Sequence, residues 1–132
     1  MQPITAPAPF DFAYRPGRIA YGDGAVEDLA EVIADAGAEH GLVVTGETVG
    51  STAAVMDPVR AGLGDRLAGV AAETTPAKRL ATAAAVVAAV EETGADALVA
   101  VGGGSSLDVA KAAVVLAASD ESVEAQAAHL AE

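Results

Sequence analysis

The stretch Ala97–Ala113, ALVAVGGGSSLDVAKAA, decides the fold that this sequence predicts. Its first five residues are apolar, which is typical of a strand buried on both faces of a parallel sheet. Three glycines follow, and Ser105-Ser106-Leu107-Asp108 then has the form of a capping box, in which Ser105 caps the amide of Asp108. The sequence therefore predicts a strand, a glycine turn and a helix that begins at about Ser106.

The three glycines, Gly102, Gly103 and Gly104, form a turn suited to a phosphate group. Glycine accepts positive φ and lets backbone N–H groups approach a ligand with no Cβ in the way. The amides and the dipole of the following helix attract an anion at the same place. The turn matches neither the GxGxxG fingerprint nor a Walker A sequence, and glycines in a turn often have only a structural role. Its position between a buried strand and a helix favours a phosphate site.

A second candidate segment, Thr45-Gly46-Glu47, lies at the carboxyl end of the strand predicted at Leu42–Thr45. Ligands of open parallel sheets bind outside the carboxyl ends of the strands. A carboxylate here would hydrogen-bond the hydroxyls of an adenosine ribose and repel a 2′-phosphate, whereas a glycine leaves room for that phosphate. Glu47 is either such a ligand or a solvated acidic side chain. Asp108 either completes the helix cap or lies beside a ligand in the glycine turn.

No residues of the chain form a recognisable catalytic or metal-binding set. The sequence has no cysteine, which excludes disulfides and thiolate metal sites. Its two histidines, His40 and His129, lie in acidic, surface-like stretches and belong to no HExxH arrangement. We therefore predict a binding site, without catalytic or metal-ligating residues in this chain.

Length and charge restrict the class of protein. With 132 residues the chain is long enough for one domain with a core. Nineteen acidic residues against seven basic ones give a formal net charge of -12, which would repel nucleic acid and anionic membranes. No leader and no apolar run of membrane-spanning length is recognisable, so a soluble cytoplasmic protein is expected. The acidic, lysine-poor composition resembles that of proteins from extreme halophiles; an acidic protein from a GC-rich genome is the alternative.

The rest of the chain alternates helices and strands. Short β-prone runs around Pro16-Gly17 predict a small N-terminal β-hairpin. Pro58 predicts a bend near Asp57 in the second helix. Strands separated by helices favour right-handed βαβ units, and hence an α/β fold with an open parallel sheet and helices on both faces. In the order helix, strand, helix, strand, helix, strand, helix, we expect these elements at about 24–36, 42–45, 53–63, 67–72, 77–92, 97–101 and 106–118.

Four stretches resemble the N-terminal domain of the iron-containing (group III) alcohol dehydrogenases. The most specific is Gly94–Lys111, which is close to the GGGSxxDxAK element of that family. The others agree with it in order and spacing: RIAYGDGA at 18–25, VVTG at 43–46 and the Pro76 turn with its helix. The resemblance implies a single Rossmann-like domain over residues 1–132 that binds NAD or NADP, with the pyrophosphate at Gly102–Ser106. Hydride transfer would then interconvert an alcohol and an aldehyde or ketone.

Two departures from the family pattern limit what the resemblance implies. Members that prefer NAD usually carry Asp where this chain has Gly46, which favours NADP, while Glu47 keeps NAD open. The family's metal ligands, for Fe²⁺ or another divalent ion, lie in a helical C-terminal domain, so this chain is expected to be an inactive fragment of a longer enzyme.

The resemblance also implies a homodimer, with the run 10–14 a candidate for pairing across it. Maleylacetate reductases, glycerol dehydrogenases and glycerol-1-phosphate dehydrogenases share much of the same sequence pattern. A stand-alone nucleotide- or phosphate-binding module is the alternative from a different class of protein.

Overall fold

Three parallel strands form the centre of the domain. The computed structural model describes residues 20–72 and 79–118 of the chain. The strands lie in the order β2-β1-β3, and they comprise β1 (Gly41–Thr45), β2 (Leu67–Ala71) and β3 (Ala97–Val101). Both neighbouring pairs are parallel, so the three carboxyl ends meet at one edge of the sheet.

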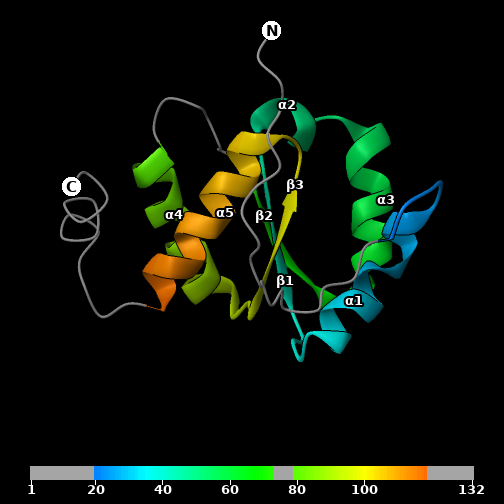
Figure 1. The fold of residues 1–132 in the computed structure, drawn as a ribbon, viewed down its shortest axis with the longest axis horizontal. Helices are drawn as coiled ribbons and strands as arrows, with labels where there is room; N and C mark the ends of the chain where they lie inside the picture. The colour runs from blue at the N-terminus through cyan, green and yellow to red at the C-terminus, as the bar shows by residue number, and fades with distance from the viewer. Residues whose placement is uncertain (1–19, 73–78, 119–132) are drawn as a thin grey trace, which may run out of the picture.

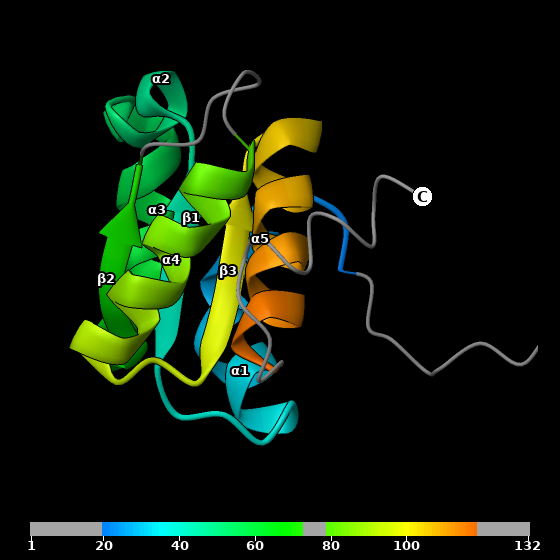
Figure 2. The ribbon, with the colours of Figure 1, turned by 90° about the vertical axis from the view of Figure 1, so that its left-hand side faces the viewer.

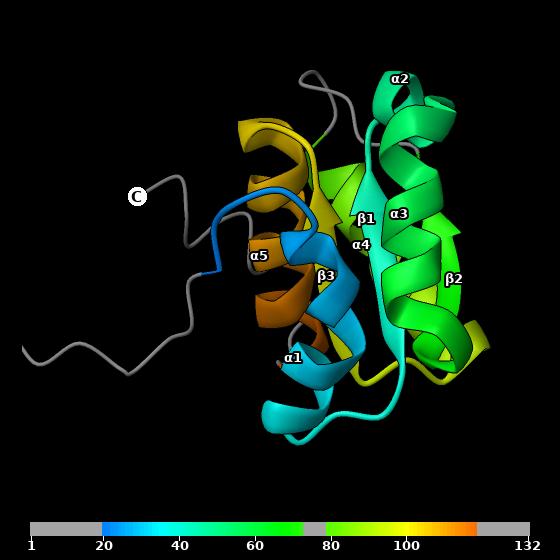
Figure 3. The same ribbon diagram turned by 90° about the vertical axis from the view of Figure 1, so that its right-hand side faces the viewer.

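Helices cover both faces of this sheet. They are η1 (Ala25–Asp28), α1 (Leu29–Asp35), α2 (Glu47–Gly50), α3 (Ala53–Leu63), η2 (Gly64–Arg66), α4 (Arg79–Thr93) and α5 (Gly104–Ala117). Figure 1 shows the strands between two helical layers, with α4 and α5 on one side and α1 and α3 on the other. Figures 2 and 3 view these two layers face on. The predicted Rossmann-like α/β fold, with an open parallel sheet between helices, is confirmed.

The central strand β1 is buried along its whole length. Leu42 and Val44 pack on the side of α4 and α5, whereas Val43 packs on the side of α1 and α3. This alternation is what the two-residue period of a strand requires when both faces are covered. The two cores therefore hold β1 in place, and with it the loop that leaves its carboxyl end.

The predicted elements agree with the structure in order and in place. The strand at 97–101 and the helix at 53–63 have the predicted bounds. Pro58 lies inside α3, and the helix continues through it. Gly37 and Gly94 have positive φ values of 81° and 69°, as expected for glycines that end helices. The predicted N-terminal hairpin lies outside the described residues except for Ala20 and Tyr21, which are not in a strand.

At the amino ends of the strands, one carboxylate ties two loops together. Asp96, just before β3, accepts hydrogen bonds from the amide of His40 at 2.8 Å and from that of Glu39 at 3.0 Å. These amides, His40 first, hold the pKa of the Asp96 carboxyl below its usual value of 3.8. The loops that lead into β1 and β3 are thereby joined at the edge of the sheet opposite the glycine turn.

The variant Asp96→Ala is expected to lower the melting temperature by a few degrees at neutral pH. Since folding depresses this pKa, the carboxylate contributes stability above the unfolded-state value and loses that contribution as the pH falls through the folded-state value. The difference between the two proteins should therefore shrink below about pH 3.8. Calorimetry between pH 2.5 and 7 measures this difference in melting temperature. The exposed Asp65→Ala controls for the loss of one charge, and a difference independent of pH would contradict the assignment.

Candidate functional site

Two loops that are far apart in the sequence leave the sheet side by side. Thr45 and Val101, the last residues of β1 and β3, are directly paired in the parallel ladder. Gly46 and Gly102 follow them, so both predicted site segments lie at neighbouring carboxyl ends of the sheet. Figure 1 shows α2 and the first turn of α5 at the same edge, above the strands. The structure therefore brings together the two segments that the sequence singled out.

The glycine turn places its three residues in different backbone conformations. Gly102 has a φ of 132°, a backbone conformation that residues other than glycine rarely adopt. Gly103 is extended, with φ -90° and ψ -166°, and is the N-cap of α5, while Gly104 is the first residue of that helix. The chain thus turns sharply out of β3 and enters a helix within three residues.

The predicted capping box is wrong. Helix α5 begins at Gly104, not at Ser106, and the amide of Leu107 donates to the carbonyl oxygen of Gly103 at 3.3 Å. Because the extended Gly103 already fills the cap position, Ser105 and Ser106 fall inside the first turn, where Ser105 cannot act as the N-cap. Because α5 begins at Gly104, the amides of Gly104 and Ser105 belong to the N-terminal turn that faces the site.

The surface above the turn is open to a ligand. Within residues 20–72 and 79–118, no atom lies within 4 Å of a Cβ built on Gly103 or on Gly104. A Cβ on Gly102 would lie 3.2 Å from Oγ of Ser106, so this residue packs inward against the helix. The first amides of an α-helix have no acceptor within the helix and, with its dipole, favour an anion. The free space and the amides fit a phosphate group.

The other predicted residues of the turn differ in exposure. Ser106 is 4% exposed and packs beneath Gly102, whereas Ser105 is half-buried. Asp108 is exposed and lies four residues after Gly104, on the same side of α5. Ser106 therefore supports the turn from inside, and Gly103, Gly104 and Ser105 form its outer surface.

After β1 the chain forms a short helix that the sequence did not predict. Gly46 is the N-cap of α2, with an extended backbone at φ -81° and ψ 163°, and Glu47 is its exposed first residue. The hydroxyls of Ser51 and Thr52 both donate to the carbonyl oxygen of Thr48, at 3.1 and 2.7 Å, where α2 gives way to α3. Gly46 and Glu47 are thus held at a helix N-terminus beside the glycine turn.

The sequence placed Thr45 in the second candidate segment, but it did not predict that this side chain joins the two segments. Its side chain is fully buried, and Oγ1 donates to the carbonyl oxygen of Val101 at 2.7 Å. A hydroxyl in an otherwise apolar, buried strand was the available signal, since such a group needs a partner.

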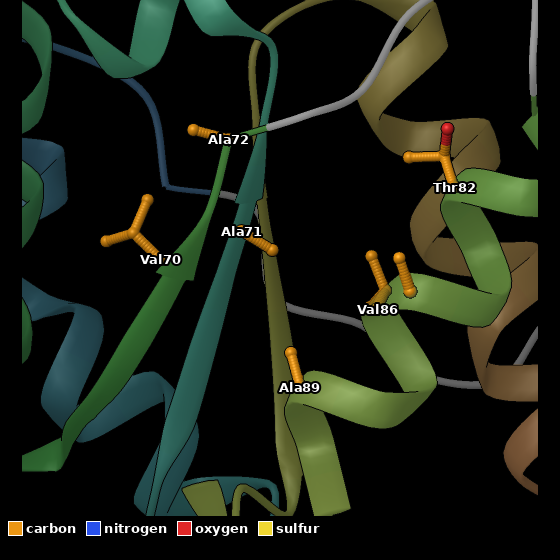
Figure 4. A pocket seen from close by; sticks show the side chains of 7 residues that line it. Val70, Ala71, Ala72, Thr82, Val86 and Ala89 are labelled. Atoms are coloured by element: carbon orange, nitrogen blue, oxygen red, sulfur yellow. The ribbon is translucent and has the colours of Figure 1, made fainter. Parts of the chain in front are cut away.

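A separate cavity of about 200 Å³ lies between β2 and α4. In Figure 4, Ala71 points from β2 toward Val86 and Ala89 of α4. Of the described lining residues, only Thr82 carries a side-chain hydroxyl, and the others have methyl or isopropyl groups. The described residues give this space no charged side chain for an anion, so the glycine turn is the better candidate site.

Among residues 20–72 and 79–118, no three His, Cys, Asp or Glu side chains are grouped so that they could hold a metal ion. The described part of the chain therefore offers a phosphate-binding turn and the adjoining N-terminus of α2, but no metal-binding group of this kind.

Comparison with known proteins shows the family of this chain. The model of the family "iron-containing alcohol dehydrogenase" matches residues 16–131. The chain belongs to this family. A maleylacetate reductase from Sphingobium indicum is 33% identical over 97 residues, which are 74% of this chain and 26% of that protein.

Solved structures of similar proteins also superpose on this chain. A putative alcohol dehydrogenase from Ralstonia eutropha superposes with a TM-score of 0.72 at 30% identity, over 82% of this chain and 30% of that protein. A maleylacetate reductase from Agrobacterium tumefaciens superposes with a TM-score of 0.68 at 29% identity, over 82% of this chain and 30% of that protein. The chain thus spans less than a third of the length of these relatives, and its described residues have a Rossmann-like α/β fold.

Proposed function

We propose that this domain binds NADP or NAD for a dehydrogenase of the iron-containing alcohol dehydrogenase family. The pyrophosphate would lie on the amides of Gly103, Gly104 and Ser105, over the open face of the turn. The adenosine ribose would lie at Gly46 and Glu47, at the neighbouring strand end. The observation that carries the proposal is the space that the described residues leave free above Gly103 and Gly104, at the N-terminus of α5.

The residues of this chain would bind and orient the cofactor, and take no part in proton transfer. When bound, the nicotinamide would carry the hydride. Helix α5 directs its N-terminal amides and dipole toward the pyrophosphate, which offsets the repulsion expected from an acidic protein with net charge -12. Asp108, exposed one turn farther along α5, would lie near the cofactor without touching its phosphates.

Titration of the full-length protein with NADPH and NADH, followed by fluorescence, tests this function. We expect micromolar binding of at least one of them, with NADPH the tighter. The titration is run at low and high KCl, because the acidic composition supports adaptation to high salt and screening would then favour the compact state. Failure to bind either dinucleotide at any salt concentration would leave the function without support.

The preference between the two cofactors is proposed to depend on Gly46. The variant Gly46→Asp is expected to weaken NADPH binding at least about tenfold relative to NADH, because its carboxylate would repel the 2′-phosphate and accept hydrogen bonds from ribose hydroxyls. The extended backbone of Gly46 suits any residue, and aspartate is a favoured N-cap for α2. The measurement is the ratio of the two dissociation constants.

Gly46→Asn is the matched control, since it has the shape and capping ability of aspartate without the charge. An equal loss of NADPH binding in both variants would assign the effect to size instead of charge. Glu47→Gln tests the other candidate at the same helix N-terminus. If Glu47 holds the ribose, that variant weakens NADH binding, and if it is only solvated, neither constant changes.

For the whole protein we propose oxidation of an alcohol to an aldehyde or ketone, or the reverse reaction. The family's name supports an iron-containing enzyme, so Fe²⁺ or another divalent ion is proposed to be held by residues outside the described part of the chain. As a Lewis acid such an ion would polarise the substrate oxygen. A helical C-terminal domain that carries this site, and a homodimer, are proposed with it.

Maleylacetate reduction is the second candidate activity. It is supported by the relative from Sphingobium indicum and by the superposed structure from Agrobacterium tumefaciens, both named as maleylacetate reductases. Steady-state assays of the full-length protein with maleylacetate and with a series of short alcohols and aldehydes distinguish the two activities. Glycerol and glycerol 1-phosphate belong in the same series.

None of the helices in residues 20–72 and 79–118 has the length and apolarity to cross a bilayer.

A further inference from the structure

The side chain of Thr45 contacts both halves of the proposed cofactor site. Its Oγ1 donates to the carbonyl oxygen of Val101, the residue that immediately precedes the glycine turn, at 2.7 Å. Its methyl group faces α2, because a Cβ built on Gly50 would lie 3.1 Å from Cγ2 of Thr45. One buried side chain thus lies between the end of β3 and the helix that begins after Gly46.

The hydrogen bond fixes the direction in which the chain enters the turn. A peptide unit is planar, so holding the carbonyl of Val101 also orients the N–H of Gly102 in the opposite direction. Gly102 then leaves the strand with a φ of 132°. Because glycine itself imposes few conformational limits, the position of this turn depends on what its neighbours hold.

The contact with α2 fixes the other half of the site in the same way. A Cβ on Gly50 would also lie 2.9 Å from Cβ of Ala72, so α2 is packed closely between Thr45 and the end of β2. The glycine turn lies near α2 as well, since a Cβ built on Gly102 would lie 3.9 Å from Cγ2 of Val49. The contacts of Thr45 therefore fix the distance between Gly46 and the glycine turn.

We infer that Thr45 is a positioning residue for dinucleotide binding, which sets the distance between the ribose end and the pyrophosphate end of the site. The inference rests on the proposed cofactor site. A dinucleotide bridges the two strand ends, so a small displacement of one loop against the other would remove contacts at one end of the ligand. Thr45 does not touch the cofactor and acts through Val101 and α2.

The variant Thr45→Val keeps the shape of the side chain and its β-branch but removes the hydroxyl that donates to Val101. In the full-length protein we expect the dissociation constant for the preferred dinucleotide to rise roughly three- to tenfold. Thr45→Ser, which restores the hydroxyl without the methyl group, should recover most of that affinity. If Thr45→Val does not fold, the pair Thr45→Ser and Thr45→Ala is compared instead, because these two differ by the hydroxyl alone.

The matched control is Thr93→Val. Thr93 makes the same kind of bond, from Oγ1 to the carbonyl oxygen of Ala89 at 2.7 Å, at the far end of α4. It should leave the dissociation constant unchanged, whatever it does to the melting temperature. A change in melting temperature with unaltered binding in Thr45→Val would overturn the inference and leave the proposed function standing. Absence of binding by the unaltered protein would overturn the proposed function and this inference with it.

Discussion

Replacing Gly103 by aspartate is expected to raise the dissociation constants for NADPH and NADH by at least about a hundredfold in the full-length protein. The carboxylate would occupy the open space above the N-terminus of α5, where we place the pyrophosphate. Two unit charges of like sign about 4 Å apart repel by about 4 kcal/mol at the effective dielectric constant of a protein surface, and the added side chain also excludes the phosphate sterically. Fluorescence titration with both dinucleotides measures the effect.

The same variant should fold normally. Gly103 has an extended backbone, so a side chain is not strained there, and its Cβ would meet no atom of the described residues within 4 Å. Aspartate is also a favoured N-cap. Equal melting temperatures of the unaltered and variant proteins without cofactor would therefore separate a lost site from a lost fold. Ala34→Asp, which adds the same charge at an exposed position of α1, is the control for net charge. Undiminished binding by Gly103→Asp would remove the pyrophosphate from this turn.

The strand before this turn could be predicted to the residue, because its apolar run is bounded by Asp96 and by the first glycine. The first residue of helix α5 could not be predicted in this way. Three consecutive glycines have the same local preferences, so the sequence cannot say which one takes the positive φ and which one becomes the N-cap. In the structure the choice follows from the end of β3, where Thr45 holds the carbonyl of Val101 and the turn starts directly after it.

The short helix α2 escaped prediction for a different reason. Four residues are too few for an apolar period, and Glu47-Thr48-Val49-Gly50 has no strong helix signal of its own. Its position depends on close packing of Gly50 against Thr45 and Ala72. Such close approaches join residues from different elements, and a pattern within one element does not reveal them. The two segments of the candidate site could therefore be located from the sequence, whereas the close contacts that join them could not.

Gly62 is a second close approach of this kind, and Gly62→Ala is expected to destabilise the domain by about 1–3 kcal/mol. It lies on the buried side of α3, where a Cβ would overlap the carbonyl oxygen of Val26 and lie 3.1 Å from its carbonyl carbon. That oxygen accepts the amide of Leu29 at the junction of η1 and α1. A methyl group on Gly62 must therefore push the start of α1 away from α3 or break this hydrogen bond.

Helix propensity alone would give the opposite sign, since alanine is more favourable than glycine within a helix by about 1 kcal/mol. The overlap prevails because backbone atoms of η1, and not the end of a flexible side chain, stand in the way. We expect the melting temperature to fall by about 5–10 °C, as measured by calorimetry without cofactor. Gly104→Ala, in the first turn of α5 with open space around its Cβ, is the matched control and should change the melting temperature little. If Gly62→Ala were as stable as the unaltered protein, α3 and η1 could not be in the close contact that carries this prediction.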